Sequence, residues 1–344
     1  MTSTLEGLMA EMIPAVEDEM RDILRLGHAA ETGAGEMFGM MQYHMGWVGA
    51  TFEVDEVPAG KRIRPLLCLL SCAAGGGDWQ QAVPAAAAIE LLHNFTLIHD
   101  DIQDNSPMRR GRPTLWQLWG VAQAINSGDA MFAVAHTALY RLGDRGVDAA
   151  IVVEAARRFD QTCLLLTQGQ YHDMHFETRD DVAVDEYIRM IGGKTAALLA
   201  LCGELGALVA GADESTTAHY GEFTRDLGMA FQVKDDILGI WGNEAAIGKS
   251  AASDVETRKK TLPVLYGLEQ NGKLRKLYRN EGNGERFVAE VVALLDEVGA
   301  RDYAQQQAER YSASALHNLE ASGAEGEAGR ALLELANMLL QREA

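Results

Sequence analysis

Helix-forming segments with few breakers run through most of this 344-residue chain. The chain contains only 7 prolines, and its long segments are rich in Ala, Leu, Met and Glu, which favour helix over strand. Residues 82–104 have no breaker after Pro84, and their apolar residues are spaced for one helical stripe. Residues 185–211 and 220–242 share this character. Because no alternating strand pattern exceeds a few residues, we predict an all-α fold.

The breaks between these helical segments are short. They are rich in glycine or in mixed polar residues and fall near residues 75–78, 143–148, 211–217 and 271–285. None is long enough to be a convincing interdomain linker. We therefore expect one domain over residues 1–344.

The charge of the chain limits its partners. It carries 50 acidic against 30 basic residues, a formal net charge of -20. This disfavours sequence-independent nucleic-acid binding and binding to an anionic membrane surface. A negatively charged ligand would need a local basic pocket or bound metal ions.

Three further features indicate a cytoplasmic protein. Residues 1–22 are polar and acidic without an apolar centre, so we expect no signal peptide. Cys68 and Cys72 lie one helical turn apart in an apolar run, which favours buried free thiols. The apolar segment 195–212 contains Glu204 and several glycines, so a buried helix is expected rather than a membrane span.

Acidic residues cluster near the end of the first helical segment. Asp100 and Asp104 are four apart and share a helix face, with Asp101 adjacent. Three carboxylates there repel one another and face the negative end of the helix dipole. Mg²⁺, which binds oxygen ligands and bridges carboxylates to phosphates, would compensate them. A solvated acidic helix end is the simpler interpretation of this cluster alone.

A second acidic cluster favours metal binding over a solvated helix end. Asp235 and Asp236 follow another apolar helical segment, so two acidic helix ends exist. If they face each other across a helical bundle, they would hold metal ions between them. The pair is more specific than either half.

Basic residues are grouped in short motifs. Arginine suits phosphate oxygens in bidentate geometry, and lysine acts as a point charge. Each basic residue alone is more often a surface charge, and "RRGRPT" alone could be a turn. The grouped residues are Lys61, Arg62, Arg64, Arg109, Arg110, Lys194, Lys249, Lys259 and Lys260.

From "GKRIRP" to "RKKTLP", these motifs together resemble the trans-isoprenyl diphosphate synthases, the polyprenyl synthetases. The resemblance implies a single helical bundle with a central active-site cavity. It also implies head-to-tail condensation of isopentenyl diphosphate with an allylic diphosphate (dimethylallyl, geranyl or farnesyl), assisted by Mg²⁺. A cytoplasmic homodimer is expected from the family.

The resemblance also implies roles for individual residues. Mg²⁺ would be bound by Asp100, Asp101, Asp104, Asp235 and Asp236. Isopentenyl diphosphate would be bound by Lys61, Arg64, His93 and Arg110, and the allylic diphosphate by Arg109, Lys194, Lys249 and Lys259. Asp100, Asp101 and Asp235 would act in catalysis, with Lys194, Thr195 and Gln232 lining the centre where the allylic cation forms. Arg62 and Lys260 receive no role.

The chain departs from the family pattern at Gly239, where a third aspartate usually stands. Asp254 is a hypothetical outer-shell group for the second cluster. A lone histidine such as His93 is usually a core residue, but it lies two turns before Asp100, on roughly the same face. We expect His99 to be structural.

Product length is expected to depend on Phe95 and Thr96, five and four residues before Asp100. A bulky side chain there would limit the depth of a tunnel for the prenyl chain, although Phe95 could simply be core. The pattern "HNFTLIHDD" resembles geranylgeranyl diphosphate synthases, which favours a twenty-carbon product, with farnesyl diphosphate next.

Three other functions stay open at this stage. A class I terpene cyclase also uses metal-bound aspartates but needs no second diphosphate site. A non-catalytic partner subunit of a synthase would be expected to have lost charged ligands. A plain acidic metal-binding helical protein would leave the basic motifs unexplained.

Overall fold

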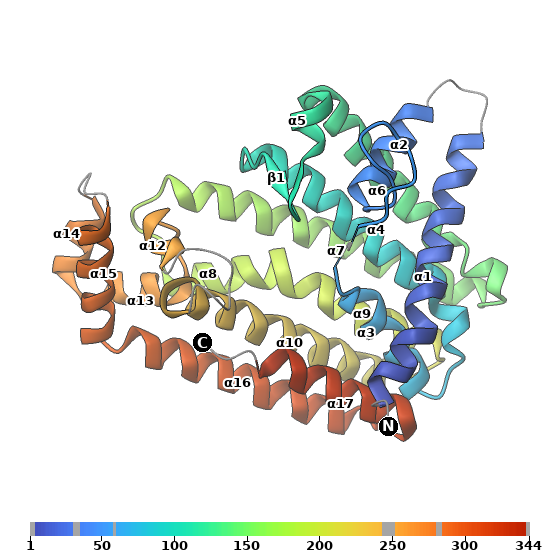
Figure 1. The fold of residues 1–344 in the computed structure, drawn as a ribbon. Coiled ribbons are helices and arrows are strands. Elements are labelled where there is room, and N and C mark those ends of the chain that lie inside the picture. The colour runs from blue at the N-terminus through green and yellow to red at the C-terminus, as the bar shows by residue number, and fades with distance from the viewer. Residues whose placement is uncertain (1–3, 30–34, 58–59, 243–251, 280–283, 342–344) are drawn as a thin grey trace. The chain divides into compact units, whose positions relative to one another are not determined.

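The fold was described from a computed structural model, which covers residues 4–29, 35–57, 60–242, 252–279 and 284–341. The described chain is helical apart from one short hairpin and an isolated bridge, which confirms the predicted all-α class (Figure 1). It divides into two compact units. The single-domain organisation stays a prediction.

The first unit comprises residues 1–159, 201–217 and 324–332. Its own elements are α1 (Thr4–Ala29), α2 (Gly35–His44), α3 (Ile63–Ala74), α4 (Trp79–Gln103), β1 (Met108–Arg109), β2 (Arg112–Pro113), α5 (Leu115–Trp119), α6 (Val121–Tyr140) and the 3-10 turn η1 (Gly143–Arg145). Four helices contribute residues to both units: α7 (Ala149–Glu177), α9 (Ala197–Val209), α10 (Glu214–Trp241) and α17 (Gly326–Leu340).

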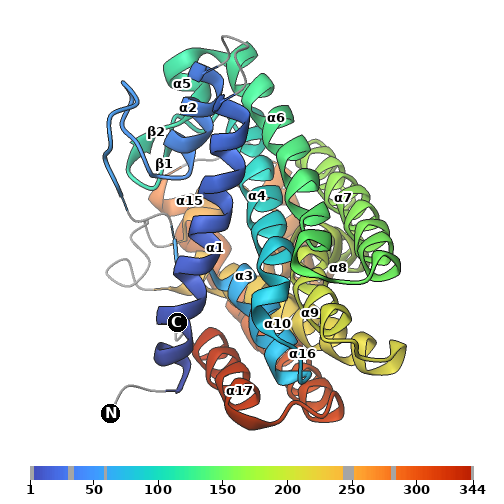
Figure 2. The ribbon, with the colours of Figure 1, turned by 90° about the vertical axis from the view of Figure 1, so that its right-hand side faces the viewer.

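Helix α4 forms the centre of the first unit. It packs against α1, α3 and α6 and lies between α1 and α6 in Figure 2. Its first half is buried on all sides, so it lacks a single apolar face. The helix begins after Asp78, whose carboxylate accepts a hydrogen bond from the Gln80 N–H at 3.0 Å. The predicted helix therefore exists, and it carries His93 and the first aspartates.

The strands β1 and β2 form an antiparallel hairpin directly after α4. Arg110 and Gly111 at its tip both have positive φ, 51° and 76°, as a type I′ turn requires. The "RRGRPT" turn is thus confirmed. The strands are too short to show an alternating pattern, which is why the sequence did not predict them.

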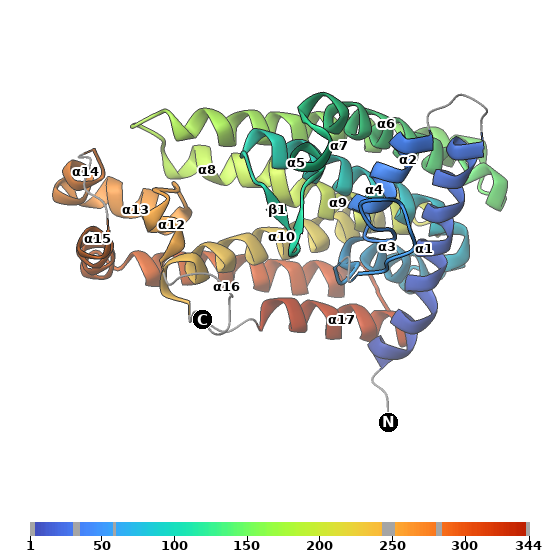
Figure 3. The ribbon, with the colours of Figure 1, turned by 45° about the horizontal axis from the view of Figure 1, so that its top comes forward.

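The second unit comprises residues 160–200, 218–323 and 333–344. Its own elements are α8 (Val184–Ile191), the π-helix η2 (Gly192–Ala196), α12 (Ser253–Glu256), α13 (Leu262–Gln270), α14 (Gly272–Arg279), α15 (Glu285–Glu297) and α16 (Ala300–Ala321). Helix α13 contacts α8, α14, α15 and α16, and Figure 3 shows α13, α14 and α15 together. One core cluster includes Tyr187, Val233 and Leu262.

The predicted helix over residues 185–211 is interrupted by η2. A β-carbon at Gly169 would lie 2.2 Å from the Lys194 backbone nitrogen, and one at Gly193 would lie 2.8 Å from the Leu165 carbonyl oxygen. The two backbones thus approach where neither residue has a side chain. Wide turns of this kind are frequent at functional sites.

The run Val184–Val209 is long and apolar enough to cross a membrane by length and composition, and 61% of its apolar window is buried. Glu204 in this run pairs with Arg158 Nη1 at 3.2 Å. This burial fits the core helix that the sequence predicted. Cys68, Cys72 and Cys202 are buried thiols that form no disulfide within the described residues, as expected for the first two.

Candidate active site

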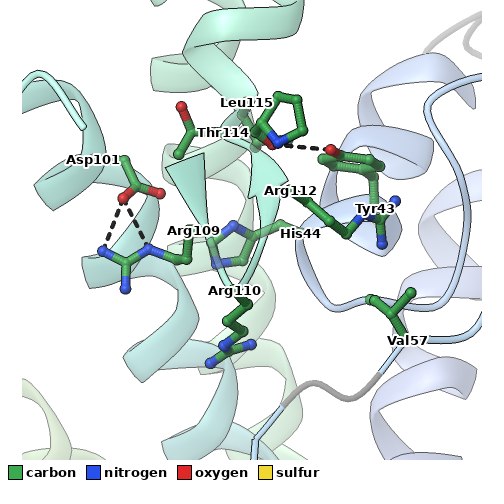
Figure 4. Close-up of a pocket in the computed structure, with 11 residues that line it drawn as sticks. Tyr43, His44, Val57, Asp101, Arg109, Arg110, Arg112, Thr114 and Leu115 are labelled. Atoms are coloured by element: carbon green, nitrogen blue, oxygen red, sulfur yellow. Dashed lines mark hydrogen bonds and ion pairs between the residues drawn. The ribbon is translucent and has the colours of Figure 1, made fainter. Parts of the chain in front are cut away.

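The acidic end of α4 contains one buried carboxylate. Asp101 is 2% exposed, and Arg109 donates to its Oδ1 from Nε and Nη2, both at 2.8 Å (Figure 4). Burial raises the pKa of Asp101, and the Arg109 guanidinium opposes this rise. A cation within the chain therefore compensates Asp101.

The other two aspartates are less buried than Asp101, and Asp100 is half-buried. Asp104 is exposed, and its N–H caps the helix by donating to the Asp100 carbonyl at 2.8 Å. Among the residues that the structure describes, no three His, Cys, Asp or Glu side chains form a ready metal cage. An incomplete set of carboxylate ligands is compatible with Mg²⁺, because substrate phosphates commonly complete its coordination shell.

Three of the residues assigned to isopentenyl diphosphate influence one another. Arg64 Nη1 lies 3.2 Å from His93 Nε2. Burial, followed by Arg64, Arg110 and Arg109, holds the pKa of His93 well below its usual value, so its imidazole is neutral. The structure thus brings His93, Arg64 and Arg110 into one electropositive region. Lys61 is exposed at the start of this segment.

Arg62, which received no role, has a structural one. It is 5% exposed and donates to Glu17 at 2.5 Å and to Glu90 at 2.6 Å. Burial acts to lower the pKa of Arg62, but Glu90 and Glu17 raise it overall. This buried triad joins α1, α4 and the start of α3. The motif "GKRIRP" could not reveal it, because both glutamates lie outside the motif.

A small cleft, with a cavity volume of about 30 Å³, lies beside Asp101. Tyr43 and Arg112 fix one wall: the Tyr43 hydroxyl donates to the Pro113 carbonyl at 2.9 Å, and the Arg112 guanidinium lies 3.9 Å from the Tyr43 ring centroid. Figure 4 shows the cleft residues. The polar or charged ones are Tyr43, His44, Asp101, Arg109, Arg110, Arg112 and Thr114. No motif marked Tyr43 or His44 in the sequence, and Arg112 lies in "RRGRPT" but was given no role there.

In the second unit, Asp236 near the end of α10 is 1% exposed and accepts three hydrogen bonds. Its Oδ2 accepts from the Tyr187 hydroxyl at 2.6 Å and from the Leu262 N–H at 3.1 Å. Its Oδ1 accepts from Gln232 Nε2 at 3.1 Å. Burial raises the pKa of Asp236 to about 6, against the lowering effect of these donors. Its role as a metal ligand stays a prediction.

The residues assigned to the allylic cation belong to the same network. Thr195 Oγ1 donates to Gln232 Oε1 at 3.1 Å, and Gln232 in turn donates to Asp236. Lys194, in the π-helix, pairs with Asp173 on α7. The structure therefore brings Thr195 and Gln232 together with Asp236. Asp173 was missed because nothing in the sequence ties it to Lys194.

Two lysines assigned to the allylic diphosphate have different outcomes. Burial acts to lower the pKa of Lys259, but Asp254, Asp236, Asp173 and Asp235, in that order, raise it overall. Lys249 lies outside the described residues.

Lys260 has a structural role that the sequence did not indicate. Its ammonium donates to carbonyl oxygens at and just beyond the C-terminal end of α7, including that of Phe176 at 2.6 Å.

The glycine that replaces the third aspartate has a specific neighbour. A β-carbon at Gly239 would lie 2.1 Å from Asp254 Oδ2, so the Asp254 carboxylate occupies the space that a side chain at position 239 would need. Asp235 is exposed on the same helix. The carboxylate missing at position 239 is thus replaced in space by one from α12.

Phe95 contacts rings on both α4 and α6. Its centroid lies 4.9 Å from that of Phe132 and 4.8 Å from that of His99, while the Thr96 hydroxyl donates to the His93 carbonyl at 2.7 Å. His99 also lies 3.5 Å from Asp129 Oδ1, in keeping with a structural role. The chain-length role of Phe95 and Thr96 stays a prediction.

Acidic helix ends, flanking cations and an all-helical fold together define the class of prenyl-transferring diphosphate enzymes. A sequence model of the polyprenyl synthetase family matches residues 50–295. The chain belongs to this family of trans-prenyltransferases, which join isoprenyl diphosphates and use a divalent metal. This membership favours a synthase over a terpene cyclase or a plain metal-binding protein.

Relatives of known function agree with this assignment. The chain is 45% identical over 243 residues to geranylgeranyl diphosphate synthase of Mycobacterium tuberculosis, covering 71% of this chain and 68% of that protein. It is 38% identical over 348 residues to (2E,6E)-farnesyl diphosphate synthase of Mycobacterium bovis, covering 98% and 92%. The crystal structure of a polyprenyl synthetase from Streptomyces coelicolor A3(2) matches with a TM-score of 0.86 and 34% identity, covering 97% and 99%.

Proposed function

We propose that the protein condenses isopentenyl diphosphate with an allylic diphosphate, with Mg²⁺ as its metal and geranylgeranyl diphosphate as its product. The observation that carries the proposal is that a cation of its own unit lies within electrostatic reach of each acidic helix end. Asp101 lies against Arg109 in one, and Asp235, Asp236 and Asp254 raise the pKa of Lys259 in the other. Such alternating charge suits a metal-diphosphate ligand.

Different residues would bind the metal and the two diphosphate substrates. Asp100, Asp101 and Asp104 would hold Mg²⁺ in one unit, and Asp235 and Asp236 would do so in the other. The bound metal would neutralise the charge of the departing diphosphate. We propose that Arg109, Lys194, Lys249 and Lys259 orient the allylic diphosphate. Lys61, Arg64, His93 and Arg110 would hold isopentenyl diphosphate so that its double bond attacks the allylic carbon.

The π-helix supports the step in which the allylic C–O bond breaks. Thr195 and Gln232 are locked by a hydrogen bond, so their oxygens are preorganised toward a developing positive charge. Water must be excluded there, because it would trap the cation. The proton lost after condensation would pass to the diphosphate that has left.

The product assignment rests on Phe95 and on the geranylgeranyl diphosphate synthase relative. Farnesyl diphosphate is the second candidate, because the farnesyl diphosphate synthase relative matches 98% of the chain. Incubation with Mg²⁺, isopentenyl diphosphate and each allylic starter, followed by chromatography of the dephosphorylated products, decides between them. Absence of any product that needs isopentenyl diphosphate would contradict the proposal.

We further propose a cytoplasmic homodimer without a membrane span. The free cysteines suit a reducing compartment. Leu164 and Tyr171 on α7 are each 64% exposed and seven residues apart, so they share a helix face that a second copy could cover. Light scattering of the wild type and of a Leu164→Glu variant tests the dimer. An unchanged mass in the variant would exclude this face as the interface.

A further inference from the structure

We propose that His44 is an additional binding residue for the diphosphate of isopentenyl diphosphate, and this inference rests on the proposed function. His44 is the last residue of α2, and it lines the cleft together with Asp101, Arg109 and Arg110. Figure 4 draws its ring beside the β1–β2 hairpin that carries both arginines.

The position of His44 is fixed by its neighbour in sequence. The Tyr43 hydroxyl donates to Pro113 on β2 at 2.9 Å, and the Arg112 guanidinium covers the Tyr43 ring while donating to the Val48 carbonyl at 2.7 Å. The end of α2 is thus attached to the hairpin by contacts that do not involve His44. The His44 imidazole therefore takes no part in these contacts and stays available in the cleft that it shares with the two arginines.

The imidazole carries unused hydrogen-bonding capacity. Its Nε2 is buried, and no hydrogen-bond partner for that atom is found among the described residues. A buried polar atom without a partner is costly, so such atoms in native proteins commonly face a ligand or water. Arg64 Nε is likewise buried, and no hydrogen-bond partner for it is found among the described residues.

The surroundings select an anion as that ligand. Burial, then Arg110, Arg109 and Arg62, lower the pKa of His44 to about 3, while a side-chain hydrogen bond with Asn94, whose geometry satisfies neither His44 Nε2 nor Asn94 Oδ1, raises it. The ring is therefore neutral at pH 7 and, with its proton on Nε2, donates one hydrogen bond without adding a further repelling charge. His44 also lowers the pKa of His93, which places both rings within electrostatic reach of one another.

These neighbours assign His44 to one of the two substrates. Arg110 and His93 are residues proposed for isopentenyl diphosphate, and Arg110 has no ion-pair partner in the part of the chain that the structure describes. A diphosphate that neutralises Arg110 would thus also reach His44. Arg109, by contrast, is already paired with Asp101.

The experiment uses the full-length protein with Mg²⁺ and measures KM separately for isopentenyl diphosphate and for the allylic substrate. His44→Phe keeps a ring but removes the donor, and we expect it to raise KM for isopentenyl diphosphate about tenfold or more. KM for the allylic substrate should stay within about twofold. His44→Gln, which keeps an N–H donor, should recover most of the loss.

The controls separate the possible failures. His317→Gln on α16 changes an exposed histidine and should match the wild type. His44→Met, also without a donor, replaces the phenylalanine variant if that variant does not fold. Unchanged KM for isopentenyl diphosphate in the donor-free variants of an active protein overturns this inference alone. A wild type that neither binds nor uses isopentenyl diphosphate overturns the proposed function instead.

Discussion

The two acidic helix ends are compensated in different ways. At the end of α4, Asp101 is buried against a guanidinium, that of Arg109. At the end of α10, Asp236 is buried against the neutral donors of Tyr187, Gln232 and the Leu262 backbone. Similar sequence motifs thus hide an ion pair in one unit and a hydrogen-bond network in the other, because the residues packed around each helix end differ.

The largest expected effect tests whether both ends act in the reaction. Asp101→Asn and Asp235→Asn should each lower turnover by a factor of roughly 10²–10³ or more, because each removes a charge that would hold the metal and the leaving group. Steady-state kinetics and far-UV circular dichroism together show that turnover falls while helical content stays. Asp129→Asn, beside His99, is the matched control. Near-normal turnover in one variant would mean that only the other end is catalytic.

A second prediction sharpens the account of the α10 end. Gly239→Asp should reduce turnover and cost about 1–3 kcal/mol of unfolding free energy, because its β-carbon would displace the Asp254 carboxylate. The double variant Gly239→Asp/Asp254→Gly should recover much of both losses, since it moves the carboxylate rather than adding one. Turnover and denaturant unfolding measure the two effects. If the double variant is no better than the single one, the replacement of one carboxylate by the other is refuted.

Acid should affect the two units in opposite directions. The folded-state pKa of His44 is about 3, below its unfolded value near 6.5, so its contribution to stability is full above about pH 6.5 and is lost as pH falls. The folded-state pKa of Asp236 is about 6, above its unfolded value near 4, so its contribution is present below about pH 4 and is lost as pH rises through 6.

Unfolding free energies at pH 7 and pH 5, without metal, test this contrast. Between these values His44→Gln should lose up to about 2 kcal/mol less than the wild type. Asp236→Asn, which removes the opposing titration of the other unit, should increase the loss. Equal pH dependence in the wild type and the His44 variant would show that His44 does not stay neutral in the folded state.

The smallest expected effect concerns Phe95, which lies on α4 before the acidic end of that helix. No residue of the second unit was assigned a similar role in product length. Phe95→Ala should lengthen the product by opening space against α6, with little change in turnover. Because Phe132 contacts Phe95, Phe95→Ala/Phe132→Ala should lengthen it further. Chromatography of dephosphorylated products measures both. An unchanged product distribution in both variants would make Phe95 a simple core residue.

Much of the local structure could be predicted because it depends on neighbours in sequence. The helix with His93 and the first aspartates was found from its composition and period, and α10 ends at Trp241, one residue before the predicted Gly242. The interruption at η2 was not found. Gly192 and Gly193 indicate flexibility, but the wide turn depends on the approach of α7 at Gly169, which is distant in sequence.

The sequence by itself determined the helical class, the family and the positions of the two acidic helix ends, since these follow from residue type and short-range spacing. Only the tertiary structure decided which charges are used inside the chain: Arg62 in a buried triad, Lys260 at the end of α7, and Asp254 in the space beside Gly239. It also placed His44, which no motif marks, beside two arginines more than sixty positions later in the chain. The physical reason is that ion pairs and burial depend on distances between segments, which the order of residues does not specify.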